Sequence, residues 1–534
     1  MSSSPAFASS IADDGSVSME NDLKYLHGRV DPGQDDSIGL LETIPTTDPR
    51  LVDSQMSPAT DGEKGVTPSA DTISPPETLD VTGLKKHSLT DLPSELVDQI
   101  LSLLSAVDLV RVSSTCRLLS TLATSDLAWY HHVQDNVPGV KLTSPAPCTS
   151  YRELYQMHDP HWFLTKYKIW FCDFFLTGKL ILVRYDPRRG CIEGYRLVAE
   201  RQPPQFRPWE FDDEVIIHSF EPHVRLHLDQ PVIQLDALSL ESLMASSVKS
   251  ARAGHRFSAE TPMRLGASHA RPIFSNFLLT RPVTPRPNMQ LWPPLTIPAR
   301  ERVRNASQEQ FVGVGHKPQN RSEVSDQAFR IRQWMEMTLG QSPGVHLGEE
   351  VFTYATLDPA LYTPTKDKPW RGIWMGDYSG HGVEFLLMHQ PETEAFDEAS
   401  VVQRPDETPA EWKERKIEAR KYRGRLEAIK LTGDPNVPRG EHTFIVDDLG
   451  EDGYIRTVTE KTFHGARIVK SRGHIAARMF RNDKYIESQL ILISGDRLAQ
   501  YWVGFGHISF YDRVNIDSFL SPYQDIRQNN CFKK

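Results

Sequence analysis

The amino-acid sequence predicts an α+β fold in which a small helical module precedes a mostly antiparallel β-barrel. Leucines and other apolar residues recur at helical spacing within residues 88–130, where Leu96 and Ile100 fall on one face. Short runs rich in β-branched and aromatic residues then fill much of residues 150–520. Residues 245–324 interrupt these runs and show neither the helical nor the strand spacing of apolar residues. This indicates an insertion between two groups of strands.

The composition narrows the class of protein. The chain has 534 residues and a formal net charge of −10, so the whole protein is not an evident nucleic-acid binder. Its 5 cysteines are scattered without a CxxC pair, which favours reduced thiols in an intracellular protein. No basic start with an apolar run opens the chain, and no stretch approaches the ~18 apolar residues of a membrane helix. We therefore expect a cytoplasmic or nuclear protein, or one found in both places.

Residues 1–84 have the composition of a disordered tail. They carry 15 acidic and 4 basic residues, with proline, serine and threonine throughout and few aromatic residues. Such a segment cannot bury enough apolar surface to offset the entropy lost on ordering. We expect a disordered acidic tail here.

Residues 85–135 predict a module of three short helices. Pro93 is placed to open the first helix and Asp91 to cap it, while Asp108 and Ser125 stand where two later N-caps are expected. The stretch resembles the F-box family over roughly 45 residues. The matching residues are Leu89, Leu92, Pro93, Glu95, Leu96, Ile100, Asp108, Leu109, Cys116, Arg117 and Trp129.

The resemblance implies that this module docks on a Skp-type adaptor, which joins it to a cullin scaffold and a ubiquitin-conjugating enzyme. A unit of roughly 45 residues is near the lower limit for a self-sufficient core. A partner that buries its remaining leucines, at about 1.5–3 kcal/mol each, accounts for the excess apolar surface. The alternative is a helical subdomain packed on its own chain. The expected adaptor-binding residues are Leu92, Pro93, Glu95, Leu96, Ile100, Leu104 and Leu109.

The strands predict one barrel built from two parts of the chain. Residues 150–244 are expected to form its first half and residues 325–525 the remainder, because closure removes the exposed edges of a long antiparallel sheet. Residues 245–324, rich in arginine, proline and serine, are expected to be a disordered insertion. A basic tract of this kind is either a nucleic-acid or acidic-partner site or a solvated linker. After it, Ser325 is expected to begin one amphipathic helix that contains Phe329.

No constellation of residues satisfies the geometry of an enzyme. Ser379 and His381 stand close together, but Asp377 and His381 occupy the positions where a nucleophile elbow requires glycine. The 19 histidines form no HExxH motif and no pair with cysteine. We expect no catalytic residue, no metal site and no cofactor.

Aromatic residues around a glycine-rich reversal are the candidates for a binding site. Glycines at 376, 380 and 382 let the backbone turn and let a ligand approach closely. Tryptophan and tyrosine are favoured where binding energy concentrates, although each is equally suited to the barrel core. The candidate substrate-binding residues are Trp370, Trp374, Tyr378, His381, Tyr501 and Trp502.

The second half of the chain is similar to the cyclin-D-binding F-box family, the F-box-only protein thirty-one group. The similarity rests on GIWMGDYSGHGVE at 372–384, LEAIKLTGDPNVPRGEHTF at 426–444, GHIAAR at 473–478 and YWVGFGHISFYDRV at 501–514. The resemblance implies a barrel that captures the C-terminal tail or a short degron of a target protein. The arginine-rich insertion and acidic tail depart from the family, so the target does not carry over.

The sequence therefore predicts a non-catalytic substrate-recognition subunit of a Skp–cullin–F-box (SCF) ubiquitin ligase. Its expected partners are a Skp-type adaptor, a cullin reached through that adaptor, and protein targets, with or without phosphorylation. Two alternatives remain open: a lipocalin-like barrel that binds a small molecule, and a nucleic-acid-associated protein acting through the arginine-rich insertion.

Overall fold

The computed structural model describes residues 88–241, 260–263, 265, 273–282, 297, 303–304, 318, 320–337, 345–378, 381–392 and 395–525. The acidic tail predicted for residues 1–84 lies outside these residues. Among the described helices, none combines the length and the apolar character that crossing a membrane requires.

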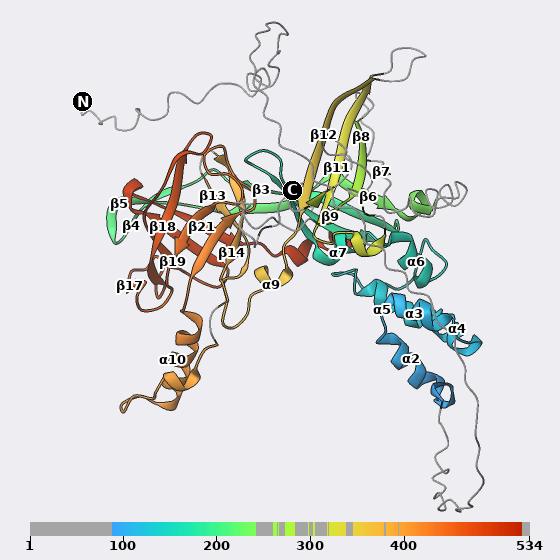
Figure 1. Cartoon of the computed structure of the whole chain (residues 1–534). Coiled ribbons are helices and arrows are strands. Elements are labelled where there is room, and N and C mark those ends of the chain that lie inside the picture. Colours follow the sequence, from blue (N-terminus) through green and yellow to red (C-terminus); the bar gives the residue numbers. More distant parts are fainter. Residues whose placement is uncertain are drawn as a thin grey trace, which may run out of the picture. The chain divides into compact units, whose positions relative to one another are not determined.

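Short helices build the first part of the described chain (Figure 1). Serines cap four of them: Ser88, Ser105, Ser125 and Ser150 each accept a hydrogen bond from a backbone N–H in the first turn. Two predicted caps differ from this. Pro93 is itself the N-cap of α2, and Ser105 takes the place expected for Asp108. The elements are η2 (Leu89–Asp91), α2 (Ser94–Ser102), α3 (Ala106–Ser113), α4 (Arg117–Ala123), α5 (Asp126–Gln134), α6 (Tyr151–His158) and α7 (Phe163–Tyr167).

An eight-stranded sheet follows the helices. Its strand order is β6-β3-β2-β1-β12-β11-β8-β7, and the neighbours that pair along this order are antiparallel. Its strands are β1 (Ile169–Cys172), β2 (Lys179–Asp186), β3 (Cys191–Arg201), β6 (Pro222–Asp236), β7 (Thr261–Met263), β8 (Ile273–Leu279), β11 (Ala328–Met337) and β12 (Val345–Ala355). A separate two-stranded pair joins β9 (Arg281–Pro282) to β10 (Val303–Arg304).

The barrel closes on itself with eight strands. The order β13-β14-β15-β16-β18-β19-β20-β21 returns to its start because β13 also pairs with β21, where Trp374 lies opposite Arg513. Its strands are β13 (Gly372–Asp377), β14 (Val383–His389), β15 (Leu426–Lys430), β16 (His442–Val446), β18 (Arg467–Ala477), β19 (Arg481–Leu492), β20 (Arg497–Trp502) and β21 (His507–Arg513). Three strands extend this sheet: β4 (Phe206–Trp209) and β5 (Asp212–His218) beside β21, and β17 (Tyr454–Thr457) beside β18.

Alternation along the strands divides the apolar residues among three clusters. On β2, Ile181 and Val183 join the cluster that also contains the buried residues of α2–α7. Leu180 and Leu182 face the other way and pack with outward-facing barrel residues. The barrel interior holds the third cluster, which includes Trp374, Leu386, Phe444, Leu490 and Leu498. One sheet therefore packs between the helices and the barrel.

The predicted class, a helical module followed by antiparallel sheets with a closed barrel, is confirmed. The expected composition of the barrel was wrong. Strands between residues 372 and 513 close it without the eight-stranded sheet, and only β4 and β5 from the predicted first half join its sheet. Alternation identifies strands, but it does not say which distant strands pair.

The predicted insertion at 245–324 was wrong in part, because β7 and β8 lie within it. Strand β8 pairs with β11 from Phe329↔Leu279 to Met335↔Ile273, and Phe277 is completely buried. Most of the other residues in this range lie outside the described chain. The helix expected after Ser325 is instead strand β11, since Phe329 and Ile331 alternate into the core.

The remaining helical elements stand between and after the strands. They are α9 (Pro359–Tyr362), the charged helix α10 (Pro409–Lys421), and the 3-10 turns η6 (Arg321–Glu323), η8 (Glu398–Ser400), η9 (Val503–Phe505), η10 (Ile516–Phe519) and η11 (Pro522–Gln524). Helix α10 is solvated: Thr408 and Glu411 form a capping box, and no residue of α10 is buried.

Candidate functional site

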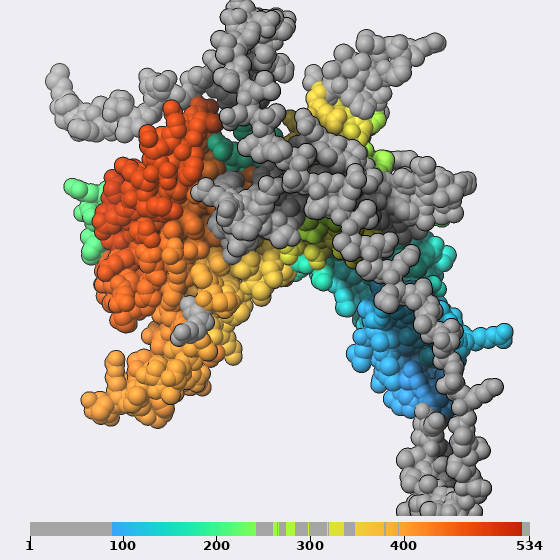
Figure 2. Space-filling model, in the orientation of Figure 1, coloured from blue at the N-terminus to red at the C-terminus, as the bar shows by residue number. Residues whose placement is uncertain are grey.

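The helical module of residues 89–135 exposes many of its large apolar side chains. Leu101, Leu109 and Trp129 are almost completely buried and form its core with the following helices. Figure 2 draws the module in blue, with one side of its surface in view. Its exposed large apolar side chains are Leu89, Leu92, Leu96, Ile100, Leu103, Val107, Val110, Leu118 and Leu127. A set of this size on so small a unit indicates a surface for a protein partner.

The predicted adaptor residues divide between surface and core. Leu92, Pro93, Glu95, Leu96 and Ile100 are all exposed, as an adaptor-binding role requires. Leu103, which the prediction omitted, is 86% exposed and is the most exposed leucine of the set. Its place next to Leu104 in the same helical stripe was the signal that could have revealed it.

Two of the predicted adaptor residues have a structural role instead. Leu104 is half-buried and packs against the core, while Leu109 is 0% exposed inside it. Leu109 was therefore wrongly placed on the surface. Leu109 packs α3 against its neighbours in the core.

A second candidate site is the mouth of the barrel, a cavity of about 240 Å³. It opens at the end where β13, β15, β18 and β20 finish and β21 begins. Aromatic and histidine side chains form much of its wall, and Lys430 and Asp434 contribute charged groups. The lining residues are Asp377, Tyr378, His381, Lys430, Asp434, Asn436, Val437, Thr443, His474, Ile475, Ala476, Trp502, Phe505, His507, Ser509 and Tyr511.

The structure brings half of the predicted substrate-binding residues to this mouth. Tyr378, His381 and Trp502 line it. Trp370 and Trp374 belong instead to the buried cluster inside the barrel. Tyr501 points to the outer surface of the barrel, where its ring lies 5.6 Å from that of Trp209.

Prediction missed several mouth residues because they come from strands far apart in the sequence. Asp434, Asn436 and Val437 belong to the unusual LTGDPNVPRGE turn, which was the available signal. Asp434 Oδ1 accepts hydrogen bonds from the backbone N–H groups of Asn436 (2.6 Å) and Val437 (2.8 Å), which fixes this turn at the rim.

A buried ion cluster forms the floor of the mouth. Lys430 Nζ lies 2.6 Å from Asp434 Oδ2 and 2.8 Å from Glu384 Oε2, and only the first contact has hydrogen-bond geometry. The ammonium also stands 4.2 Å from the centre of the Tyr378 ring. Tyr378 Oη in turn donates to Thr443 Oγ1 at 2.7 Å.

Burial decides the protonation states of this floor. It raises the pKa of Glu384 to about 8, although Lys430 opposes the shift. Burial would also raise the pKa of Asp434, but the charge and hydrogen bond of Lys430 lower it overall. The neutral form of Glu384 is therefore favoured at neutral pH, whereas Asp434 keeps its charge beside Lys430.

Aromatic rings and uncharged polar groups complete the walls. Trp502 Nε1 donates to Ser509 Oγ at 3.0 Å, and Tyr511 Oη donates to Gln500 Oε1 at 2.7 Å. The ring of His507 stacks on that of His218 at 4.9 Å. Burial, reinforced by His218, lowers the pKa of His507 to about 4, so that ring is neutral at physiological pH.

The mouth has the character of a binding site. A few placed polar groups are surrounded by aromatic walls, which is the pattern of sites that orient a ligand. The ammonium of Lys430 is already paired with Asp434 and Glu384. The arrangement can hold a narrow peptide segment or side chain.

Comparison with known proteins matches both candidate sites. Residues 89–135 match the F-box-like model, and residues 354–518 match the model of the cyclin D1 binding domain. The second match spans all eight strands of the closed barrel.

One curated relative shows a weaker similarity. The chain is 24% identical over 183 residues to Protein EXECUTER 2, chloroplastic, of Arabidopsis thaliana. The match covers 33% of this chain and 24% of that protein, so it spans about a quarter of the relative's length.

F-box-like domains are in general the parts of SCF substrate-recognition subunits that bind a Skp-type adaptor and, through it, a cullin. F-box proteins are in general non-catalytic subunits of such complexes. With the helical module at residues 89–135 and the matched barrel at 354–518, the chain combines a region similar to F-box-like domains with a region similar to the cyclin D1 binding domain.

Proposed function

We propose that the chain is the substrate-recognition subunit of an SCF-type ubiquitin ligase whose barrel mouth binds a degron or C-terminal tail of a target protein. The observation that carries the proposal is the position of the cavity. It opens at one end of a barrel that coincides with the matched binding domain, while the rest of the barrel interior is filled by side chains.

The dimensions of the mouth favour a narrow ligand. A cavity of about 240 Å³ accommodates one or two side chains, or the end of a peptide. Phe505 is 55% exposed at the rim and can cover further residues of a bound segment. The filled interior leaves no deep chamber of the kind that a lipocalin-like carrier requires, so the small-molecule alternative is disfavoured.

The helical module completes the proposed role. Its exposed leucines and Ile100 supply an apolar surface for a Skp-type adaptor, through which a cullin is reached. This chain does no bond chemistry of its own. It raises the effective concentration of a target lysine near the conjugating enzyme.

Replacement of exposed mouth residues tests the target-binding half of the proposal. We expect the double variant Phe505→Ala with His381→Ala to fold normally, because both side chains are exposed. Loss of two rim contacts, at about 1 kcal/mol or more each, predicts at least about a tenfold weaker affinity. The matched control is Phe211→Ala, which removes an equally exposed ring (57%) outside the mouth.

The measurement has two arms. Proteins retained by each variant from extracts of proteasome-inhibited cells are quantified by mass spectrometry, and purified cyclin D1, which gives the matched domain its name, is titrated directly. The proposal fails if the mouth variant retains the same targets at the same level as wild type. It also fails if the Phe211 control loses them equally.

A further inference from the structure

The chain continues past the barrel as a strap that returns to the eight-stranded sheet. The strap comprises residues 514–525 and follows the last barrel strand, β21. Val514, Ile516, Phe519 and Leu520 are buried in the apolar cluster shared by the barrel and the sheet. The strap is therefore packed in place and is not a frayed end.

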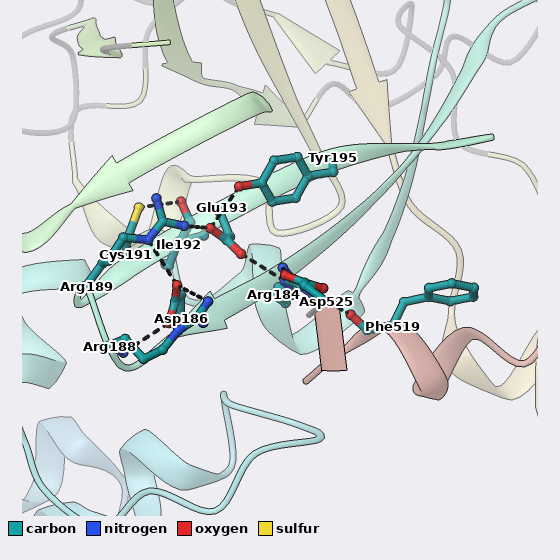
Figure 3. A network of polar contacts seen from close by, with 10 residues as sticks. All are labelled: Arg184, Asp186, Arg188, Arg189, Cys191, Ile192, Glu193, Tyr195, Phe519 and Asp525. Atoms are coloured by element: carbon teal, nitrogen blue, oxygen red, sulfur yellow. Dashed lines mark hydrogen bonds and ion pairs between the residues drawn. The ribbon is translucent and has the colours of Figure 1, made fainter. Parts of the chain in front are cut away.

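A buried arginine holds the far end of the strap (Figure 3). The guanidinium of Arg184, on β2, binds both oxygens of the Asp525 carboxylate, with Nη1 at 2.9 Å from Oδ1. The same Nη1 donates to the carbonyl oxygen of Phe519 at 3.0 Å, and Nε donates to Glu193 Oε1 at 2.9 Å. Arg184 and Glu193 side chains are each 1% exposed. Such a charge requires its partners, since solvent cannot replace them.

The surrounding charges leave no substitute for Asp525. Arg189 binds Glu193 and Asp186, and Arg188 binds Asp186. The network thus holds three cations, Arg184, Arg188 and Arg189, against three carboxylates, one of which is supplied by the strap. Loss of the Asp525 charge leaves the buried Arg184, within this network, with Glu193 as its carboxylate partner, and Glu193 is shared with Arg189.

A second contact ties the strap to the segment that follows the helical module. Gly139 has φ +81°, and a Cβ at this position would lie only 2.4 Å from Cβ of Leu520. Both the backbone conformation and this close approach therefore require glycine. Val137 and Val140, which flank Gly139, belong to the core cluster that includes the helical module. The strap thus contacts the barrel, the sheet and the chain beside the module.

We propose that residues 514–525 act as a clasp, locked by the Asp525–Arg184 ion pair, which holds the barrel in a fixed orientation to the helical module. Resting on the proposed function, the clasp positions a bound target for ubiquitin transfer. Asp525 is then a positioning residue: it contacts neither the target nor the adaptor, yet it controls how productively the two are brought together.

The test compares Asp525→Asn with two matched variants in the full chain. Asp525→Glu keeps the charge and is the rescue variant. Asp517→Asn removes another strap carboxylate, whose side chain is 70% exposed and pairs with Lys168, so that pair is expected to contribute little.

Three results are expected for Asp525→Asn. Hydrogen exchange of the strap amides accelerates by at least about tenfold, as expected when a buried charge loses its partner. The distribution of single-molecule energy-transfer efficiencies between dyes at Thr121 on α4 and Glu487 on β19 broadens. Affinities for the adaptor and for purified cyclin D1 stay unchanged, while the kcat of ubiquitin transfer falls severalfold at constant KM. Asp525→Glu restores part of each change, and Asp517→Asn behaves as wild type.

The proposal is overturned if the energy-transfer distribution of Asp525→Asn matches that of wild type. It is also overturned if target affinity falls together with the transfer rate, since Asp525 would then only support the fold of the barrel. The energy-transfer measurement needs no target. If the chain binds no target but the energy-transfer distribution of Asp525→Asn still broadens, the proposed function is refuted and the clasp proposal is supported.

Discussion

Gly473 gives a sharp test of how the barrel mouth is built. This glycine lies on β18, and a Cβ added to it would stand 2.3 Å from Cζ3 of the Trp502 ring. Ordinary van der Waals contact begins near 3.4 Å, so Gly473→Ala forces the indole to move by about 1 Å. That movement disturbs the hydrogen bond of 3.0 Å from Trp502 Nε1 to Ser509 Oγ.

The expected loss of stability combines two effects. Overpacking of a filled site destabilises by about 1–3 kcal/mol. A lost hydrogen bond adds about 1 kcal/mol, so Gly473→Ala is expected to lower the free energy of unfolding by about 2–4 kcal/mol. Because Trp502 lines the mouth, target affinity also falls. Urea denaturation measures the first effect and titration with a target measures the second.

Two further variants isolate the proposed cause. Gly504→Ala, near the same mouth, meets no atom within 4 Å and is expected to change stability little. Trp502→Leu removes the ring that Gly473→Ala would strike, so the double variant is expected to be less destabilised than the sum of the single changes. Equal stabilities of Gly473→Ala and Gly504→Ala, or strict additivity in the cycle, would refute this packing argument.

Three other predictions concern buried residues. Leu109→Ala should lower the free energy of unfolding, measured by urea denaturation, by about 2–5 kcal/mol because the Leu109 side chain is buried in the core. An unchanged free energy of unfolding would contradict this buried position. Trp374→Ala should lower the free energy of unfolding by about 3–5 kcal/mol and unfold the barrel, whereas His381→Ala should affect only target binding. Equal effects of the two variants on stability would contradict the assignment of Trp374 to the barrel interior and of His381 to the mouth. Glu384 has its folded-state pKa raised to about 8 from 4.5, so the folded state binds the extra proton and loses stability as pH rises between those values. Glu384→Gln should therefore gain stability relative to wild type across that window, and a pH-independent difference would contradict the shift.

The sequence predicted local structure better than long-range pairing. The helical module could be recognised because its leucine spacing and its serine caps act within a few residues of one another. The barrel depends on the pairing of Trp374 with Arg513, which are far apart in the chain. No local pattern encodes such a pairing, so the strands were assigned to one barrel in place of two sheets.

In the binding site too, the sequence predicted local features better than contacts between distant residues. Tyr378 and His381 could be predicted because they lie in the glycine-rich turn that follows β13, but Trp374 on β13 itself faces the interior. Only the closed barrel shows which aromatic residues point inward, since one residue of register reverses the face. Lys430 was missed because a lysine within a strand gives no sign of being buried beside Glu384 and Asp434.

The most direct test of the central claim is adaptor binding by the exposed face of the helical module. We expect the double variant Leu96→Ala with Ile100→Ala to lose co-purification with a Skp-type adaptor while its thermal unfolding stays unchanged, because both side chains are exposed. Ile417→Ala, which removes an equally exposed side chain from α10, should bind as wild type. Undiminished adaptor binding by the folded double variant would contradict the account.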